Sequence, residues 1–271
     1  MQIFKRMHGG GWLLLLVMLS ISGCASRPWG GIVDEQKSGE AAQRYERLVE
    51  QSETWASGFD GELTAQFHSQ LEDIAYSGFF RMLAPSYLKF VISNPLGQPM
   101  VAIASNDRLY QILNTTDRSF KTVTLRSFSL RNGIPQSFMR GHWFAWLTGR
   151  PLQEQIRIRS IREDPAGRGV WLEIGDNTEA AAPLEYLLLD PSRPRIIERI
   201  IVDSDSSLQA TIAYENWQPL SGGEQPMHIA VSGLSFGATA TFVFNDLRAA
   251  ELKPRDFNLP FPQGYSRQFL P

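Results

Sequence analysis

The residues that come nearest to a catalytic motif are Gly233-Leu234-Ser235-Phe236-Gly237, which match the Gly-x-Ser-x-Gly pattern of a serine nucleophile. That nucleophile needs a sharp turn leading from a strand into a helix. Here, residues 238–244 continue with the apolar and polar alternation of a strand. We therefore predict that Ser235 is not a nucleophile.

Acid/base and metal chemistry have equally little support. The four histidines are scattered, at His8, His68, His142 and His228. The chain contains neither a His-x-x-x-His pair nor a Cys-x-x-Cys pair, the spacings typical of metal ligands. We interpret two groups of acids, Glu72-Asp73 and Asp203 with Asp205, as solvated turn acids rather than as a general acid/base pair. No nucleotide-binding motif is present, so we predict that the protein is not an enzyme and uses no metal or cofactor.

The single cysteine, Cys24, excludes an intramolecular disulfide and lies directly after Ile21-Ser22-Gly23. An aliphatic residue, two small residues and a cysteine resemble the bacterial lipobox, in which the cysteine is acylated and becomes the new amino terminus. The alternative is an ordinary secretory signal with a coincidental cysteine. Two or three acyl chains would make the membrane anchor effectively permanent.

The residues before Cys24 have the organisation of a signal peptide. Lys5 and Arg6 precede an apolar run from Trp12 to Leu19. That run is much shorter than the roughly 20 residues of a membrane-spanning helix. We predict a signal peptide over 1–23, an acylated cysteine and tether over 24–38, and one domain over 39–271.

Composition sets wider limits. The chain has 271 residues, is 43% hydrophobic and carries a net charge of −2. A body of this size buries enough apolar surface to fold without disulfides. It lacks the basic face that nucleic-acid binding requires, so we predict no nucleic-acid partner.

A helix and many strands are predicted from periodicity. Ser38 is a candidate cap for a helix ending near Ala56, with apolar residues at helical spacing. After Gly58 the period changes to two, with turn residues between the segments. The predicted strands cover about 59–68, 74–84, 87–93, 99–105, 108–114, 154–161, 169–174, 184–189, 195–203, 208–215, 227–232 and 241–245. Short strands at hairpin spacing predict a mostly β protein with one large antiparallel sheet, curved or closed.

One more helix is predicted from Pro135 to Leu147, with Gly149 just beyond its end. Its apolar residues spread over more than half of its circumference. Such a helix must cover an apolar sheet face or plug its opening.

Two segments are more specific than the rest. The first is Leu88-Lys89-Phe90-Val91-Ile92-Ser93-Asn94-Pro95-Leu96-Gly97, a strand ending in a tight turn. The second runs from Gly133-Ile134-Pro135 to Trp146-Leu147-Thr148-Gly149-Arg150-Pro151. Behind a lipobox, and in this order, they resemble the LolB family of outer-membrane lipoprotein receptors, as does the strand Pro226–Val231. The tail over 252–271 departs from that family and looks more like the ends of the wider LolA-like group.

The resemblance implies an unclosed β-barrel with an α-helical lid over an apolar cavity. It also implies that the hairpin Asn94, Pro95, Leu96 and Gly97 is a membrane-insertion loop, with Leu96 exposed. Read from the sequence alone, Leu96 is an ordinary apolar turn residue. Candidate acyl-chain cavity and lid residues are Phe79, Met82, Leu88, Phe90, Phe138, Met139, Trp143 and Trp146. For any one of these residues, plain core packing is the competing interpretation.

The functional expectation follows from the family. The chain would be anchored in the outer membrane and face the periplasm, because Ala25 rather than Asp follows Cys24. It would accept acylated lipoproteins from a LolA-like periplasmic carrier and insert them into that membrane as a monomer. The alternatives are a lipid- or glycolipid-binding lipoprotein of the same fold, and a non-catalytic envelope scaffold.

Overall fold

The computed structural model describes residues 27–70, 72–94, 96–106, 108–132, 143–152, 156–176, 185–202, 207–234 and 237–270. Its helices are α2 (Glu35–Thr54), α3 (Leu125–Asn132) and α4 (Trp143–Thr148), with a 3₁₀ turn η3 (Pro254–Phe257). Its strands are β1 (Gly58–His68), β2 (Asp73–Leu83), β3 (Tyr87–Ser93), β4 (Pro99–Ser105), β5 (Leu109–Asn114), β6 (Ser119–Thr124), β7 (Ile156–Glu163), β8 (Val170–Asp176), β9 (Glu185–Leu189), β10 (Ile196–Val202), β11 (Leu208–Leu220), β12 (Gly223–Ser232), β13 (Thr239–Ala249) and β14 (Ser266–Leu270).

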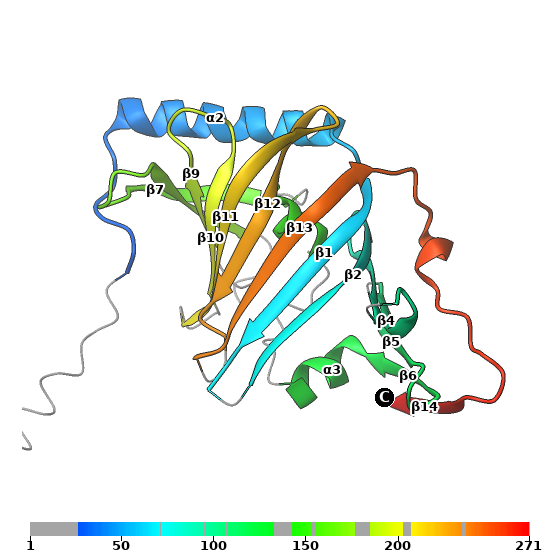
Figure 1. Ribbon diagram of the computed structural model, residues 1–271. Coiled ribbons are helices and arrows are strands. Elements are labelled where there is room, and N and C mark those ends of the chain that lie inside the picture. The colour runs from blue at the N-terminus through cyan, green and yellow to red at the C-terminus, as the bar shows by residue number, and fades with distance from the viewer. Residues whose placement is uncertain are drawn as a thin grey trace, which may run out of the picture.

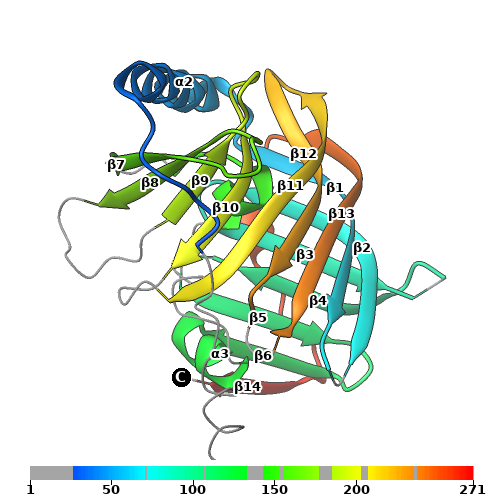
Figure 2. The same cartoon turned by 90° about the vertical axis from the view of Figure 1, so that its left-hand side faces the viewer.

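These strands form one 14-stranded sheet in the order β14-β6-β5-β4-β3-β2-β1-β13-β12-β11-β10-β9-β8-β7. The sheet has a first arm, strands β1–β6, and a second arm, strands β7–β13. Antiparallel pairing of β1 with β13 joins the two arms. The sheet curves, but β7 and β14 lie at its two ends and do not pair with each other (Figures 1 and 2). The predicted mostly β, unclosed antiparallel sheet is therefore confirmed.

Alternation along each strand gives the sheet an inner and an outer face. Along β2, Phe80 and Met82 are buried on the inner face, in the main core cluster that also contains residues of α2 and α4. Phe79 and Arg81 lie on the outer face, because successive side chains of a strand point to opposite sides. The main core therefore lies between the inner face and the two helices.

Helix α2 begins three residues before the predicted cap. The Asp34 side chain, not Ser38, accepts a hydrogen bond from the backbone N–H of Lys37 at 2.9 Å, which satisfies a free donor of the first turn. Its buried residues recur at helical spacing and face the core: Ala41, Tyr45, Leu48 and Ser52. Figure 1 shows α2 lying across the ends of the strands of the second arm.

Both ends of the described chain pack on the outer face. The described part of the segment predicted as a tether packs on the sheet, since the Trp29 ring stacks on Tyr186 with a centroid distance of 3.8 Å. At the other end, the tail predicted to follow the last strand continues the sheet as β14, which pairs in parallel with β6. Strand β6 and helix α3 were also absent from the predicted elements.

The described core clusters draw on residues from Trp29 onward. Removal of the predicted signal peptide, residues 1–23, therefore leaves every described core side chain in the protein. Among the described residues, no helix combines the length and the apolar character needed to cross a membrane.

Candidate functional site

The β3–β4 hairpin presents Leu96 to solvent. The Leu96 side chain is 83% exposed. The Asn94 carboxamide oxygen accepts hydrogen bonds from the backbone N–H groups of Leu96 at 3.0 Å and Gln98 at 2.9 Å. The backbone N–H of Gly97, at φ +77°, donates to the carbonyl of Asn94 at 2.8 Å. A turn fixed by these contacts holds Leu96 outward without help from the core.

In Figure 2 this hairpin extends beyond the strands on either side of it. Met100, at the start of β4, is also exposed. A groove of about 690 Å³ runs beside the base of the hairpin, with Phe79, Ser93 and Met100 among its lining residues. The hairpin and groove together make an apolar edge at one end of the first arm. Pro95 lies outside the described residues.

Phe79 does not belong with the other candidate cavity residues. It lines that groove and lies under the guanidinium group of Arg81, whose Cζ is 5.0 Å from the ring centroid. The prediction combined Phe79 with Met82, but residues three apart in a strand face opposite sides of a sheet. Phe79 is therefore corrected to an outer-face residue.

The structure does bring five of the candidate cavity residues together, in one packed cluster on the inner face: Met82, Leu88, Phe90, Trp143 and Trp146. Trp143 and Trp146 of α4 meet edge to face, with their ring centroids 5.6 Å apart. An open cavity for acyl chains remains a prediction. Phe138, Met139 and Cys24 lie outside the described residues.

The segment after α4 contains a residue that the sequence analysis named only as part of a motif. Gly149, at φ +64°, ends the helix, and a Cβ there would come within 2.7 Å of the Trp217 ring. The chain then turns Arg150 into the interior, where only 7% of that residue is exposed. Glycine is required at this position because it tolerates both the left-handed backbone and the close approach.

Arg150 is held mainly by aromatic rings. Its Cζ lies 5.0 Å from the ring centroid of Phe144, 5.1 Å from that of Trp55 and 5.4 Å from that of Phe59. Its Nη1 donates to the carbonyl of Ala56 at 2.9 Å. Burial lowers the pKa of the Arg150 guanidinium to about 10, so it stays charged at neutral pH.

A buried ion pair supports the backbone of the same residue. Arg199, fully buried on β10, donates from Nη2 to the Arg150 carbonyl and from Nη1 to Glu185 Oε2 at 3.0 Å. Burial raises the pKa of Glu185, although the positive charge of Arg199 opposes that rise. This pair connects the end of α4 to β9 and β10.

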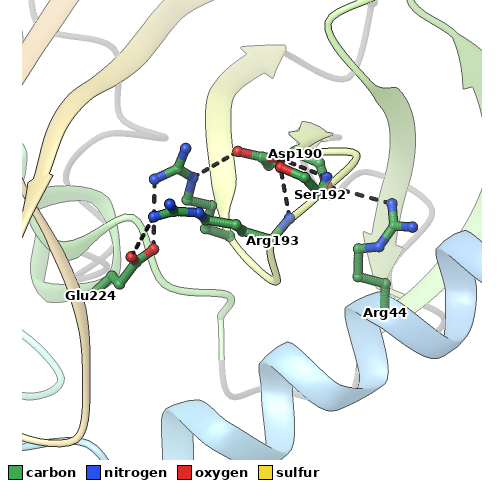
Figure 3. A network of polar contacts seen from close by, with 6 residues as sticks. Arg44, Asp190, Ser192, Arg193 and Glu224 are labelled. Atoms are coloured by element: carbon green, nitrogen blue, oxygen red, sulfur yellow. Dashed lines mark hydrogen bonds and ion pairs between the residues drawn. The ribbon is translucent and has the colours of Figure 1, made fainter. Parts of the chain in front are cut away.

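A second polar network joins α2 to the second arm (Figure 3). Asp190 accepts from the backbone N–H of Ser192 at 2.8 Å and from that of Arg193 at 3.1 Å. Arg193 pairs with Glu224 of β12 at 2.8 Å, while Arg44 of α2 donates to the Asp190 carbonyl at 3.4 Å. These contacts position the helix, and their oppositely charged groups are paired. No grouping of metal ligands occurs among the described residues.

Comparison with solved structures shows a LolA/LolB-like fold. A LolA superfamily protein from Nitrosomonas europaea matches 79% of this chain and 97% of its own, with a TM-score of 0.51 and 14% identity. A domain from Vibrio parahaemolyticus, described as an outer membrane lipoprotein-sorting protein, matches 82% and 95%, with a TM-score of 0.50 and 12% identity. A DUF1329 family protein from Desulfovibrio piger matches 80% and 96%, with a TM-score of 0.55 and 10% identity.

No family model and no curated protein matches the chain by sequence. At 10–14% identity, the structural likeness establishes the fold and does not assign a cargo or a membrane.

Proposed function

We propose that this protein is an outer-membrane lipoprotein that accepts acylated lipoproteins from a LolA-like periplasmic carrier and inserts them into the outer membrane. The observation that carries the proposal is Leu96, 83% exposed on a hairpin whose turn is closed by hydrogen bonds to the Asn94 side chain. A leucine left in water forgoes about 1.5–3 kcal/mol of burial. Contact with a bilayer would recover that free energy.

The amino terminus supports the same location. Acylation of Cys24 would anchor the chain, and the segment between Cys24 and Trp29 would separate the anchor from the packed body. The residue after the cysteine is Ala25, which favours the outer membrane under the rule for enteric-type bacteria.

No catalytic group is needed for this function, and we propose that the protein is not an enzyme. A sixteen-carbon acyl chain in an apolar site gains on the order of 12 kcal/mol relative to water, at about 0.8 kcal/mol per methylene. Movement from one apolar site to another, or to a bilayer, is close to neutral. Transfer therefore requires contact between the partners rather than a chemical energy source.

The test is a transfer assay with Leu96→Glu. Protein starting at residue 24 and carrying Cys24→Ala is mixed with a carrier loaded with an acylated lipoprotein, and cargo is followed into liposomes. Loss of about 1.5–3 kcal/mol of membrane burial should slow insertion at least about tenfold. Acceptance of cargo from the carrier and the melting temperature should stay unchanged, because Leu96 makes no core contact.

Leu208→Glu is the matched control, since Leu208 is 53% exposed at the start of β11, away from the hairpin. It should insert cargo at the wild-type rate. Equal rates for Leu96→Glu and the wild type would remove the hairpin from the mechanism. If the protein that carries only Cys24→Ala takes no cargo from a competent carrier, the proposal is refuted.

A second candidate function is binding of another lipid or glycolipid by the same fold. The observation that favours it is the buried Arg150, a positive charge in an apolar setting, which an acyl chain alone does not require. Lipids that copurify with the protein distinguish the two: bound lipid without any lipoprotein transfer would favour this candidate.

A further inference from the structure

Arg150 lines a small hollow at one corner of the fold. The hollow has a volume of about 180 Å³ and lies between the end of α2, the β2–β3 turn and the segment that follows α4. Its apolar lining includes Trp55, Phe144, Pro85 and Pro151. At about 30 Å³ per water molecule, the space would hold about six waters or one small polar group with a few carbons.

Arg150 differs from Arg199, the other arginine that is buried among the described residues, because the described residues give it no acidic partner. Arg199 is paired with Glu185 at 3.0 Å, and Arg168 with Glu198 at 2.6 Å. The described residues place no carboxylate within ion-pair distance of Arg150, and its buried Nε has no hydrogen-bond partner among them. An unpaired buried charge and an unsatisfied buried donor both cost free energy.

The aromatic rings offset part of that cost. Three rings face the guanidinium group, and cation–π contacts are strongest when the charge is removed from water. The Trp55 ring packs directly against Gly223, where a Cβ would come within 2.3 Å of it, so any larger residue at position 223 would displace the ring. The rings fix the position of the cation, but they supply no negative charge and no acceptor for Nε.

One acidic residue lines the hollow. Glu53 is exposed on the last turn of α2 and makes no ion pair with Arg150. Its charge would weaken the binding of an anion in the hollow.

We propose that this hollow is a binding site for an oxyanion, a carboxylate or phosphate group, carried at the end of an apolar chain. Nη1 of Arg150 donates to the Ala56 carbonyl, and Nε is buried without an acceptor, so a ligand oxygen that entered along the Nε edge of the guanidinium group would supply the acceptor that Nε lacks. Guanidinium groups bind carboxylate and phosphate through two parallel hydrogen bonds along such an edge. The apolar lining would contact the first carbons of the chain.

This site is separate from the insertion hairpin. The β2–β3 turn lines the hollow and the β3–β4 hairpin carries Leu96, so the two sites lie at opposite ends of β3. The inference goes beyond lipoprotein transfer, and each of the two proposals can fail without the other.

The experiment measures the melting temperature of the protein starting at residue 24 with Cys24→Ala, in the presence of octanoate, acetate, inorganic phosphate or octanol. At a hundredfold excess over Kd, octanoate should raise the melting temperature by roughly 5–10 °C. Octanol should have a much smaller effect, because it lacks the charge. A similar rise with acetate or phosphate would support the oxyanion site and identify a free anion, rather than a lipid head group, as its ligand.

The variants locate the effect. Arg150→Met should abolish the rise, while Arg193→Met, which removes a more exposed arginine paired with Glu224, should keep it. Glu53→Gln removes a negative charge from the lining of the hollow. It should therefore lower the octanoate concentration that produces half of the rise in melting temperature. Equal shifts with octanol and octanoate, or a shift that survives in Arg150→Met, would overturn the proposal.

A second measurement does not depend on how the variants fold. In the otherwise unsubstituted protein, the Nε–H signal of Arg150 in a proton–nitrogen correlation spectrum should move on addition of octanoate. A signal that stays in place at saturating octanoate, together with an unchanged melting temperature, would rule the site out.

Discussion

Leu96 and Arg150 each have the environment that their side chain ordinarily avoids. A leucine is held in water by a hydrogen-bonded turn, and an arginine is held away from water by three rings. Both arrangements raise the free energy of the folded chain unless a partner compensates. At the scale of single residues, these two positions are therefore the strongest indications of binding.

Asp164 shows the opposite case, a charge that is fully paired. Its side chain accepts hydrogen bonds from Arg168 Nη2 and from Trp171 Nε1, both at 3.0 Å. Although burial alone would raise the pKa of Asp164, these hydrogen bonds hold it below the usual value. The ionised form therefore stabilises the native state above about pH 4, and this stability is lost as the pH falls through the lowered pKa.

We expect Asp164→Asn to lower the free energy of unfolding by about 2–3 kcal/mol at pH 7. The difference from wild type should shrink as the pH falls below about 4, because the unfolded chain then binds the proton first and the native carboxylate follows at its lower pKa. Urea unfolding at pH 7 and pH 3 measures both. Asp73→Asn, at a side chain 80% exposed, should change little, and a pH-independent difference for Asp164→Asn would contradict the assignment.

At the scale of elements, the carboxyl-terminal tail acts as a strap on the outer face. Leu259 is buried with Ala102, Ala104 and Phe120, and its backbone N–H donates to the Gln111 side chain at 2.9 Å. Lys89 of β3 donates to the Asp256 carbonyl at 3.1 Å. The strap covers apolar residues of β4 and β6 that would otherwise face water.

Replacing Leu259 by Ala should therefore cost about 2–3 kcal/mol of stability, at the lower end of the range for buried leucines because the site lies near the surface. Phe261→Ala is the control, since Phe261 is 47% exposed and should cost less than about 1 kcal/mol. Urea unfolding of the two variants gives the comparison. A loss of less than about 1 kcal/mol for Leu259→Ala would mean that the strap does not stabilise this face.

At the scale of the whole molecule, the open sheet leaves two edge strands. Strand β7 carries Arg157, Arg159 and Arg162, and charged side chains on an edge discourage pairing with another chain. Part of that edge is covered by the segment around Ile32, which forms a bridge to Arg162. Pairing of another chain at the β7 edge is therefore disfavoured, and the monomer stays a prediction.

Hydrogen exchange should follow position in the sheet. Amides of β1 and β13 at its centre should exchange most slowly, and those of β7 and β14 at its edges fastest, because edge amides lack partners on one side. Exchange followed by mass spectrometry measures the order. Protection of β7 and β14 equal to that of β1 would instead indicate pairing of edges between chains.

The sequence by itself determined the local features of this protein. Alternation placed most strands within a few residues of their observed ends, and helical spacing found α2, because the signal lies in adjacent residues. Turn residues also identified the β3–β4 turn, whereas the exposure of Leu96 was expected only from the family resemblance. Alternation along β2 also places Phe79 and Met82 on opposite faces of the sheet.

Only the tertiary structure decided which distant segments meet. The pairing of β1 with β13, the return of the tail to β6 and the contacts of Arg150 with Ala56 and three rings depend on residues far apart in the chain. Local periodicity contains no information on such contacts, because they are selected by the total area that the folded chain removes from water. A lone arginine in a motif looks ordinary until the three rings around it are seen, with no carboxylate of the described residues within ion-pair distance.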